Sequence, residues 1–388
     1  MRNILAAAAV GCLLLAGCGS ALTPHVSGSG TAAPNGSPSG APTGPAPCGA
    51  NSSEPNSASA TLSDIQFVSP TYGWVVGKHV ILATSDGGAD WAVQERGNLD
   101  LTSVDFIDGQ TGWAAGSGSL LVTHDAGQHW TALPEPCPLI RSVHFVSARL
   151  GFAIAGGRNV ADSAPDTGGV LFATDNGGRS WQRLLAAPPN AQTVCFSTPS
   201  SGWLGASGQL YSSTDGGRTW VKRAPGLTVP HGPPAIMSVQ CAAGSAWAVN
   251  VALTAALGNM PHWGYHADAA GAVPIFAEQY FPHRGVTIKA NSPGPYPGPL
   301  SAISSATAVF IGNCPACGEG TAPWDLATNG GKTLVHQGIV GGINSPVAAS
   351  FVSSSAGWVI GQVFGSQKAR IVHTSDGGRN WQVQFSGS

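Results

Sequence analysis

One short polar segment recurs five times along this chain of 388 residues and limits the folds that the chain can adopt. Its pattern is Ser/Thr-x-Asp-x-Gly-x-x-Trp, with Asn in place of Asp in one copy. The copies end at Trp91, Trp130, Trp181, Trp220 and Trp381. Repetition at intervals of about 40 residues is typical of propellers and solenoids, in which each unit buries its apolar face only against its neighbours.

A second motif precedes each copy: an apolar strand ending in Phe, a turn, and then Gly-Trp or Gly-Phe. It lies at residues 65–77, 104–116, 143–156, 194–205 and 349–361. Each repeat therefore reads as a four-stranded antiparallel blade. Weaker copies begin at Ser238 and Leu300, with Val309 and Leu334 where Trp is expected, and raise the total to seven. We expect an all-β, seven-bladed β-propeller over residues 61–388, closed without a strand borrowed from the other terminus.

The Asp position of the recurring turn is expected to brace the fold. It is held, in chain order, by Asp86, Asp125, Asn176, Asp215, Asn329 and Asp376. An amide can accept hydrogen bonds in a turn but cannot act as a general acid or base, so the two Asn residues favour a structural role. The hydroxyl, the glycines and the tryptophan fit the same role, since they tie the strand, permit positive φ and cover the turn. Ten of the twelve Trp residues fall in the two repeated positions, and only Trp263 and Trp324 lie outside them.

The N-terminal segment predicts export. Residues 4–15 form an apolar run too short to span a bilayer, and Leu-Ala-Gly-Cys follows, ending at Cys18. This resembles a bacterial lipobox: residues 1–17 would be a lipoprotein signal peptide and Cys18 the lipidated mature N-terminus. An ordinary signal peptide is the alternative. Residues 18–60 are rich in Gly, Ser, Pro and Ala and predict a disordered tether. We expect a lipid-anchored protein on the extracytoplasmic face of the cell membrane.

Composition narrows the choice of partners. Only 9% of the residues are charged, against about 25% in a typical soluble protein, and the net charge is −2. Nothing in this balance predicts a nucleic-acid partner. We expect a monomer without a cofactor or metal.

Six cysteines remain after the signal peptide and the lipidated residue are set aside, and an oxidising compartment favours their pairing. The repeat register places Cys195 and Cys241 in the innermost strands of adjacent blades, one position apart. Cys314 and Cys317 are close enough to close a loop, which leaves Cys48 for Cys137. Fifteen pairings are possible, so this set is one hypothesis among several.

The combined motifs resemble the Asp-box, or bacterial neuraminidase repeat, and in particular the propellers related to photosystem II assembly factors. The resemblance implies a propeller over residues 61–388. It does not imply one function, because Asp boxes occur in sialidases, in some glucanases, and in receptors and assembly factors without enzymatic activity. In such proteins the boxes usually lie on the face away from the ligand.

The opposite face would carry the irregular loops, and loops on a rigid scaffold commonly carry recognition. The candidate contacts there are Arg158, His231, His262, Trp263, His266, His283, Arg284 and Tyr296. Three of these histidines could be read as metal ligands, but their spacing is informative only on a helix. A redox role for Cys314 and Cys317 would likewise need a helix N-terminus.

Two functions remain open. We expect a surface-anchored, non-enzymatic propeller that binds or helps to assemble a protein partner through its loop-rich rim. The alternative is a glycan-active enzyme of the sialidase or glycosidase type, for which Tyr265 or Tyr280 beside Glu278 could form a nucleophile pair.

Overall fold

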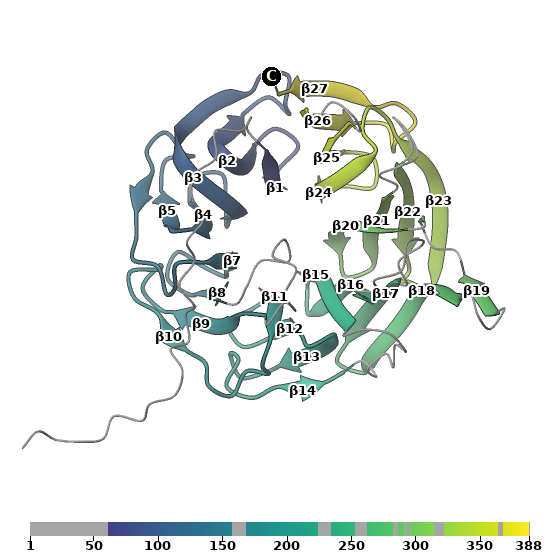
Figure 1. The fold of residues 1–388 in the computed structure, drawn as a ribbon, viewed down its shortest axis with the longest axis horizontal. Coiled ribbons are helices and arrows are strands. Elements are labelled where there is room, and N and C mark those ends of the chain that lie inside the picture. The colour runs from purple at the N-terminus through teal and green to yellow at the C-terminus, as the bar shows by residue number, and fades with distance from the viewer. Residues whose placement is uncertain are drawn as a thin grey trace, which may run out of the picture. The chain divides into compact units, whose positions relative to one another are not determined.

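Antiparallel β-strands arranged around a central axis make up nearly all of the described chain (Figure 1). The computed structural model describes residues 61–156, 168–223, 234–252, 262–281, 286–290, 293–294, 296–313, 322–363 and 368–387. The predicted signal peptide and tether lie outside these ranges. Among the described residues, no helix is long and apolar enough to cross a lipid bilayer.

The strands pair into six sheets. The first contains β1 (Leu62–Phe67), β2 (Gly73–Thr84), β3 (Ala92–Phe106), β4 (Gly112–Ser117), β5 (Ser119–Thr123) and β6 (Thr131–Ala132). The second contains β7 (Ile140–Phe145), β8 (Gly151–Ala155), β9 (Val170–Thr174) and β10 (Gln182–Arg183). The third contains β11 (Ala191–Phe196), β12 (Gly202–Ala206), β13 (Gln209–Ser213) and β14 (Val221–Lys222).

The remaining sheets follow the same order from the axis outward. The fourth contains β15 (Pro234–Ala242), β16 (Ser245–Ala252), β17 (His262–Asp268), β18 (Gly271–Phe281) and β19 (Val286–Ala290). The fifth contains β20 (Tyr296–Ser304), β21 (Thr307–Asn313), β22 (Ala322–Thr328) and β23 (Thr333–Val340). The sixth contains β24 (Ser345–Phe351), β25 (Gly357–Gln362), β26 (Ala369–Thr374) and β27 (Gln382–Ser386).

The fold is thus an all-β propeller, but the prediction of seven separate four-stranded blades is wrong: the sheets number six. The physical reason is the continuity of β3. Its first part pairs with β2, from Ala92 to Asp100, and its second part pairs with β4, from Asp100 to Phe106. The strand therefore serves both of the first two sequence repeats and joins them in one six-stranded sheet. The fourth sheet also departs from the prediction, because β19 adds a fifth strand to it.

Aromatic pairs hold successive repeats together. The Gly-Trp residue of one repeat stacks on the strand-end Phe of the next: Trp74 on Phe106, at 3.5 Å between ring centroids, and Trp113 on Phe145, at 3.6 Å. The Trp that ends the recurring turn meets the same Phe edge-on, as Trp130 meets Phe106 at 5.9 Å. The edge-on contact suits the quadrupoles of the rings, whereas the stacked pairs contribute through close packing and the burial of large apolar faces. The two motifs read from the sequence are therefore the two sides of one interface.

The ring closes through the same interface. Trp358 of the last sheet stacks on Phe67 of the first at 3.5 Å, and its indole N–H donates to the carbonyl of Gly87 at 3.0 Å. The backbone N–H of Phe67 donates to Ser350 Oγ at 2.9 Å. Each of the two sheets uses only its own strands, so closure occurs without an exchanged strand, as the sequence predicts.

Candidate binding site at the mouth of the central channel

The recurring turns form one hydrogen-bonded motif, which Asp215 illustrates. Its Oδ1 accepts the Ser213 hydroxyl at 2.8 Å and the Thr219 backbone N–H at 2.9 Å. The Ser213 hydroxyl in turn accepts the N–H of Gly217 at 2.8 Å. The turns at Asp86, Asp125, Asn176 and Asp376 repeat these bonds.

These bonds favour the ionised carboxylate. Hydrogen bonds from Thr219 lower the pKa of Asp215 to about 2. Hydrogen bonds from His129 and Asn380 lower the pKa values of Asp125 and Asp376 to about 2 as well. A group held ionised in this way braces its turn and has no proton to donate near neutral pH.

The turns also brace the neighbouring repeat. Besides Trp358 and Gly87, the indole N–H of Trp74 donates to the carbonyl of Ala126 at 3.1 Å, and that of Trp113 to Gly177 at 3.1 Å. Each acceptor directly follows the Asp or Asn of the turn. The tight turn thus presents a carbonyl that accepts the indole N–H of the preceding repeat around the ring.

The turn at Asn329 departs from this pattern, although the sequence places it in the same register. Asn329 adopts a left-handed conformation, with φ of 56°, and its amide reaches Thr333 Oγ1 at 3.4 Å. The hydroxyl position of the motif is occupied by Ala327. Without a hydroxyl to link the side chain to the glycine N–H, the turn takes another form. Trp324, from β22, lies 5.8 Å from Phe351 and fills the space that a Gly-Trp residue occupies elsewhere.

Polar side chains connect the innermost strands of adjacent repeats through hydrogen bonds. The innermost strand of a blade is an edge strand, so some of its N–H groups lack a partner in the sheet. Side chains of the neighbouring repeat supply the acceptors. Such bonds run from Val104 N–H to Asp64 at 2.9 Å, from Val143 to Ser103 at 3.2 Å, from Val239 to Thr193 at 3.3 Å, from Ala302 to Gln240 at 2.8 Å, and from Phe351 to Ser301 at 2.8 Å.

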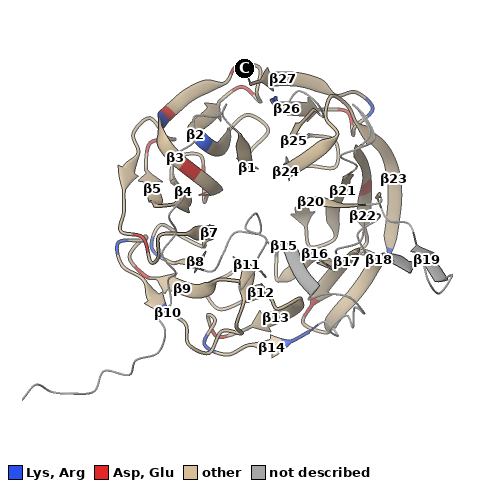
Figure 2. Ribbon diagram, viewed as in Figure 1, with Lys and Arg blue, Asp and Glu red and all other residues tan. Residues whose placement is uncertain are grey.

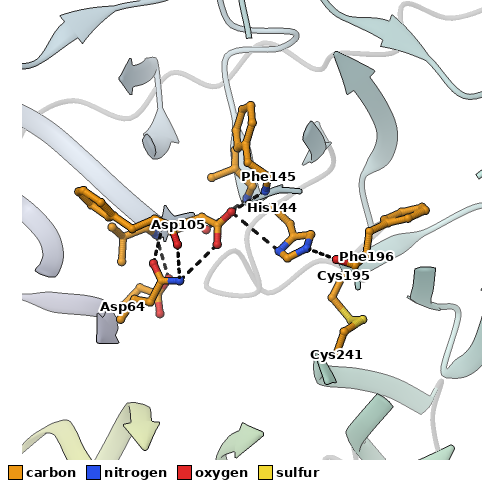
Figure 3. A network of polar contacts seen from close by, with 12 residues as sticks. Asp64, Asp105, His144, Phe145, Cys195, Phe196 and Cys241 are labelled. Atoms are coloured by element: carbon orange, nitrogen blue, oxygen red, sulfur yellow. Dashed lines mark hydrogen bonds and ion pairs between the residues drawn. A yellow bond between two sulfur atoms is a disulfide. The ribbon is translucent and has the colours of Figure 1, made fainter. Parts of the chain in front are cut away.

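The most extended part of this network lies across the first three sheets (Figure 3). Gln66 accepts the N–H of Phe106, and Asp105 accepts the N–H of Phe145. His144 Nδ1 lies 3.8 Å from Asp105 Oδ2, while its Nε2 lies 2.8 Å from the carbonyl oxygen of Phe196. Figure 3 also shows the disulfide at the end of this network.

Burial alters the carboxylates of the network. It raises the pKa of Asp64 to about 7, against the lowering effect of the N–H groups of Val104 and Ile65. It also raises the pKa of Asp105, while nearby His144 lowers it. Because both carboxylates accept backbone N–H groups, their first role is to join repeats.

A polar cavity of about 310 Å³ opens at the mouth of the central channel. It is lined from the innermost strands β1, β3, β7, β11, β15, β20 and β24, mainly near the starts of these strands, and by Asn313 at the end of β21. The recurring turns lie at the other end, because they contact the turns that follow the innermost strands, as in the 2.9 Å bond from Gly87 N–H to Thr71. The lining includes Ser63, Asp64, Thr102, Arg141, Ser142, Gln192, Ser238, Pro299, Asn313 and Val347. We call this cavity the channel-mouth pocket.

The predicted contact residues are not gathered in this pocket. Trp263 is buried in an apolar cluster, and His262 is only 1% exposed, because β17 places both within a sheet instead of in a loop. His266 packs on Trp247 at 4.5 Å, and its Nε2 lies 2.9 Å from the Ser305 carbonyl oxygen. Tyr296 begins β20, directly before the pocket residue Pro297. Arg158, His231, His283 and Arg284 lie outside the described residues.

The residues of the pocket were missed by sequence reasoning. A signal was available, since the innermost strands carry polar residues such as Thr102, Arg141 and Gln192 at equivalent repeat positions. Because the innermost strands surround the axis, polar residues that recur at this position would have indicated a polar channel.

The remaining site predictions concern metal, nucleophile and disulfides. No group of His, Cys, Asp and Glu suited to a metal ion occurs among the described residues. Tyr265 is buried in an apolar cluster, which raises its pKa to about 12 and does not suit a nucleophile; the Glu278 and Tyr280 side chains are not described.

The predicted bond between Cys195 and Cys241 is present, with 5.7 Å between the Cα atoms. It joins the innermost strands of the third and fourth sheets. Cys137 is also disulfide-bonded. Its predicted partner Cys48, and the pair Cys314 and Cys317, lie outside the described residues, as does Cys18.

The fold and its turns define a class: the described residues form a β-propeller whose recurring turns are similar to the BNR, or Asp-box, repeat. Residues 54–189 match the family described as photosynthesis system II assembly factor YCF48. No curated protein matches the chain.

Solved structures show the same fold at low identity. YCF48 bound to D1 peptide is 18% identical, with a TM-score of 0.52, covering 82% of this chain and 92% of that one. The GH74 xyloglucanase from Xanthomonas campestris is 12% identical, with a TM-score of 0.56, covering 84% of this chain and 54% of the enzyme. The RRP9 WD40 repeats are 8% identical, with a TM-score of 0.54, covering 79% and 88%.

Proposed function

We propose that this protein is a non-enzymatic propeller, anchored to the extracytoplasmic face of the membrane through Cys18, that binds an extended segment of a protein partner in the channel-mouth pocket. The pocket carries the proposal. It is a polar opening lined by the innermost strands, and it lies at the end of the channel opposite the turns that brace the fold.

The comparisons support a protein ligand. The matching family is described as an assembly factor, and one similar propeller was solved with a bound peptide. The pocket suits a peptide, because hydroxyl and amide side chains can pair with the N–H and C=O groups of an extended backbone.

We also propose that the six-stranded first sheet works as two propeller units, which makes seven units in all. Two observations support this reading. The described residues form seven apolar clusters, and seven innermost strands line the pocket, together with Asn313 at the end of β21.

The glycosidase alternative has less support. Glycoside hydrolysis generally needs two carboxyl groups on either side of the scissile bond. Among the described lining residues, Asp64 supplies the one carboxylate, and its two oxygens accept the N–H groups of Ile65 and Val104. The xyloglucanase shares only the fold at its level of identity.

Site-specific photo-cross-linking in the producing cell tests the proposal. Val347 lines the pocket and is 44% exposed, whereas Val383 lies on the outermost strand β27 and is 50% exposed. A benzophenone side chain at 347 is expected to yield a discrete protein adduct that the same group at 383 does not. Val347→Arg is expected to weaken recovery of that protein by about tenfold, and Val383→Arg to leave it unchanged. Equal adducts at both positions would exclude the pocket as the binding site.

A further inference from the structure

Charged residues are distributed unevenly around the ring (Figure 2). From residue 61 to 139 the chain carries two basic residues, Lys78 and Arg96, against nine acidic ones. In the described residues from 140 to 223 this balance is reversed. Asp175 and Asp215 stand against seven basic residues, which are Arg141, Arg149, Arg179, Arg183, Arg218, Lys222 and Arg223.

Five of these basic side chains are exposed: Arg149, Arg179, Arg183, Arg218 and Lys222. Among the described residues none of the five forms an ion pair. The turn that contains Arg179 has Asn176 in the Asp position, which removes a carboxylate that most of the other turns carry. No described carboxylate therefore neutralises the charge of these side chains through an ion pair.

The five residues lie on neighbouring elements, and we call them the basic surface. The turn that carries Arg179 contacts Arg149, since the N–H of Gly177 donates to the Arg149 carbonyl at 2.8 Å. Leu184, next to Arg183, lies against Gly217, the neighbour of Arg218. Lys222 follows on β14. In Figure 2 basic residues mark this arc of the ring, around β9, β10 and β14.

Two aliphatic side chains project beside the basic surface. Leu185, two residues after Arg183, is 82% exposed, the largest value among the exposed large hydrophobic residues of the described chain. Val221, directly before Lys222, is 53% exposed. An aliphatic side chain flanked by cations is a combination suited to the interface of a lipid bilayer, where the cations meet headgroups and the apolar group enters the acyl boundary.

We propose that the basic surface docks the propeller on anionic lipid headgroups. Exposed Leu185 and Val221 favour a bilayer over an acidic protein, because cations alone would suffice for the latter. The proposal rests on the anchored location in the proposed function, since a tether of residues 18–60 would reach only about 35 Å and would keep the propeller near the membrane. Docking through blades on one side would tilt the ring and leave the channel-mouth pocket accessible.

Binding to vesicles tests the proposal independently of the anchor and of the pocket. The full chain carrying Cys18→Ser, which cannot be lipidated, is sedimented with phosphatidylcholine vesicles that contain about one third phosphatidylglycerol. The test variant is Arg183→Gln with Arg218→Gln and Lys222→Gln. Its control is Arg96→Gln with Lys332→Gln and Arg379→Gln, which changes the net charge equally at exposed positions elsewhere. Arg379 occupies the same turn position as Arg218.

Wild type and control are expected to bind, and the test variant to lose affinity by about tenfold or more. Binding should weaken with added salt and be absent from vesicles of phosphatidylcholine alone. Leu185→Ser is expected to weaken binding severalfold, while Val273→Ser, at a residue 60% exposed, is not.

Equal binding by the two triple variants, or no binding by the wild type, would overturn the proposal. Binding of poly-glutamate but not of vesicles would assign the surface to an acidic protein instead. None of these outcomes alters the cross-linking test at Val347.

Discussion

At the scale of single residues, the carboxylates of this protein fall into two groups with opposite effects on stability. Asp64, partly buried at an inter-repeat contact, has its pKa raised to about 7 by desolvation, above the value of 3.8 for an exposed carboxyl group. The folded state thus binds an additional proton between about pH 4 and pH 7, and the stabilising contribution of this proton is complete below about pH 4 and lost as the pH rises through 7. The turn aspartates have lowered pKa values and lose their contribution only as the pH falls towards 2.

We therefore expect Asp64→Asn to flatten the decrease in unfolding free energy between pH 5 and pH 8, because the amide does not titrate. Urea unfolding of wild type and variant at both pH values measures this change. An equal decrease in both proteins would show that Asp64 titrates normally.

For the turns, Asp215→Asn should leave the melting temperature near that of the wild type, since Asn176 already serves in an equivalent turn. Asp215→Ala removes the acceptor of Thr219 and Ser213 and should lower the melting temperature by a few degrees. Calorimetry of both variants checks this, and equal melting temperatures with loss of partner binding in both would indicate a functional carboxylate instead of a brace.

At the scale of elements, one interface recurs with small changes. Phe152 replaces the usual Trp and stacks on Phe196 at 3.7 Å, so stacking persists there without an indole donor. Trp358→Phe should accordingly lower the unfolding free energy by about 1 kcal/mol, the value of a hydrogen bond, and Trp358→Ala by about 3 to 5 kcal/mol. Denaturant titration measures both. Trp74→Phe is the matched control at an internal interface and should behave like Trp358→Phe; a much larger loss at 358 would mean that ring closure depends on this contact in particular.

The disulfide supports another interface. Cys195 and Cys241 are 46 residues apart, so the chain-entropy model gives about 4 kcal/mol for their bond. Replacing both by Ser should lower the unfolding free energy by about 2 to 4 kcal/mol. A variant as stable as the wild type under non-reducing conditions would contradict this expectation.

Much of the element pattern could be predicted because it repeats. The strand order and the turn chemistry follow from aligning five strong copies, each with Phe, Gly-Trp or Gly-Phe and the polar turn, and the Cys195–Cys241 register follows from aligning the weaker copy at Ser238 with them. The prediction failed where a repeat lacks the residues of the two motifs. Residues 262–268 carry no repeat motif, and β17 buries His262 and Trp263 that were expected in a loop. The number of sheets could not be read either, since nothing in the motifs shows that β3 continues from one repeat into the next.

At the scale of the whole molecule, the lipid at Cys18 and the basic surface would both hold the protein at the membrane. If Cys18 is lipidated, Cys18→Ser should shift most of the protein from the membrane fraction to the soluble fraction or the medium, because stable anchoring needs more than weak surface contacts. Fractionation at high salt, which suppresses binding by the basic surface, isolates the contribution of the lipid. Unchanged fractionation under these conditions would exclude the anchor.

The closure of the ring also affects how such a chain can evolve. Leu62 and Phe385, near the two ends of the described chain, lie in the same apolar cluster as Trp358, and no strand is exchanged across the junction. The junction between the last and first sheets therefore needs no special structure, because it uses the same stack and indole bond as the junctions inside the chain. A circularly permuted chain, in which the propeller's ends are joined and new termini lie in another loop between repeats, would keep the same contacts. We therefore expect circular permutation to be better tolerated here than in a propeller whose terminal blade combines strands from both ends of the chain.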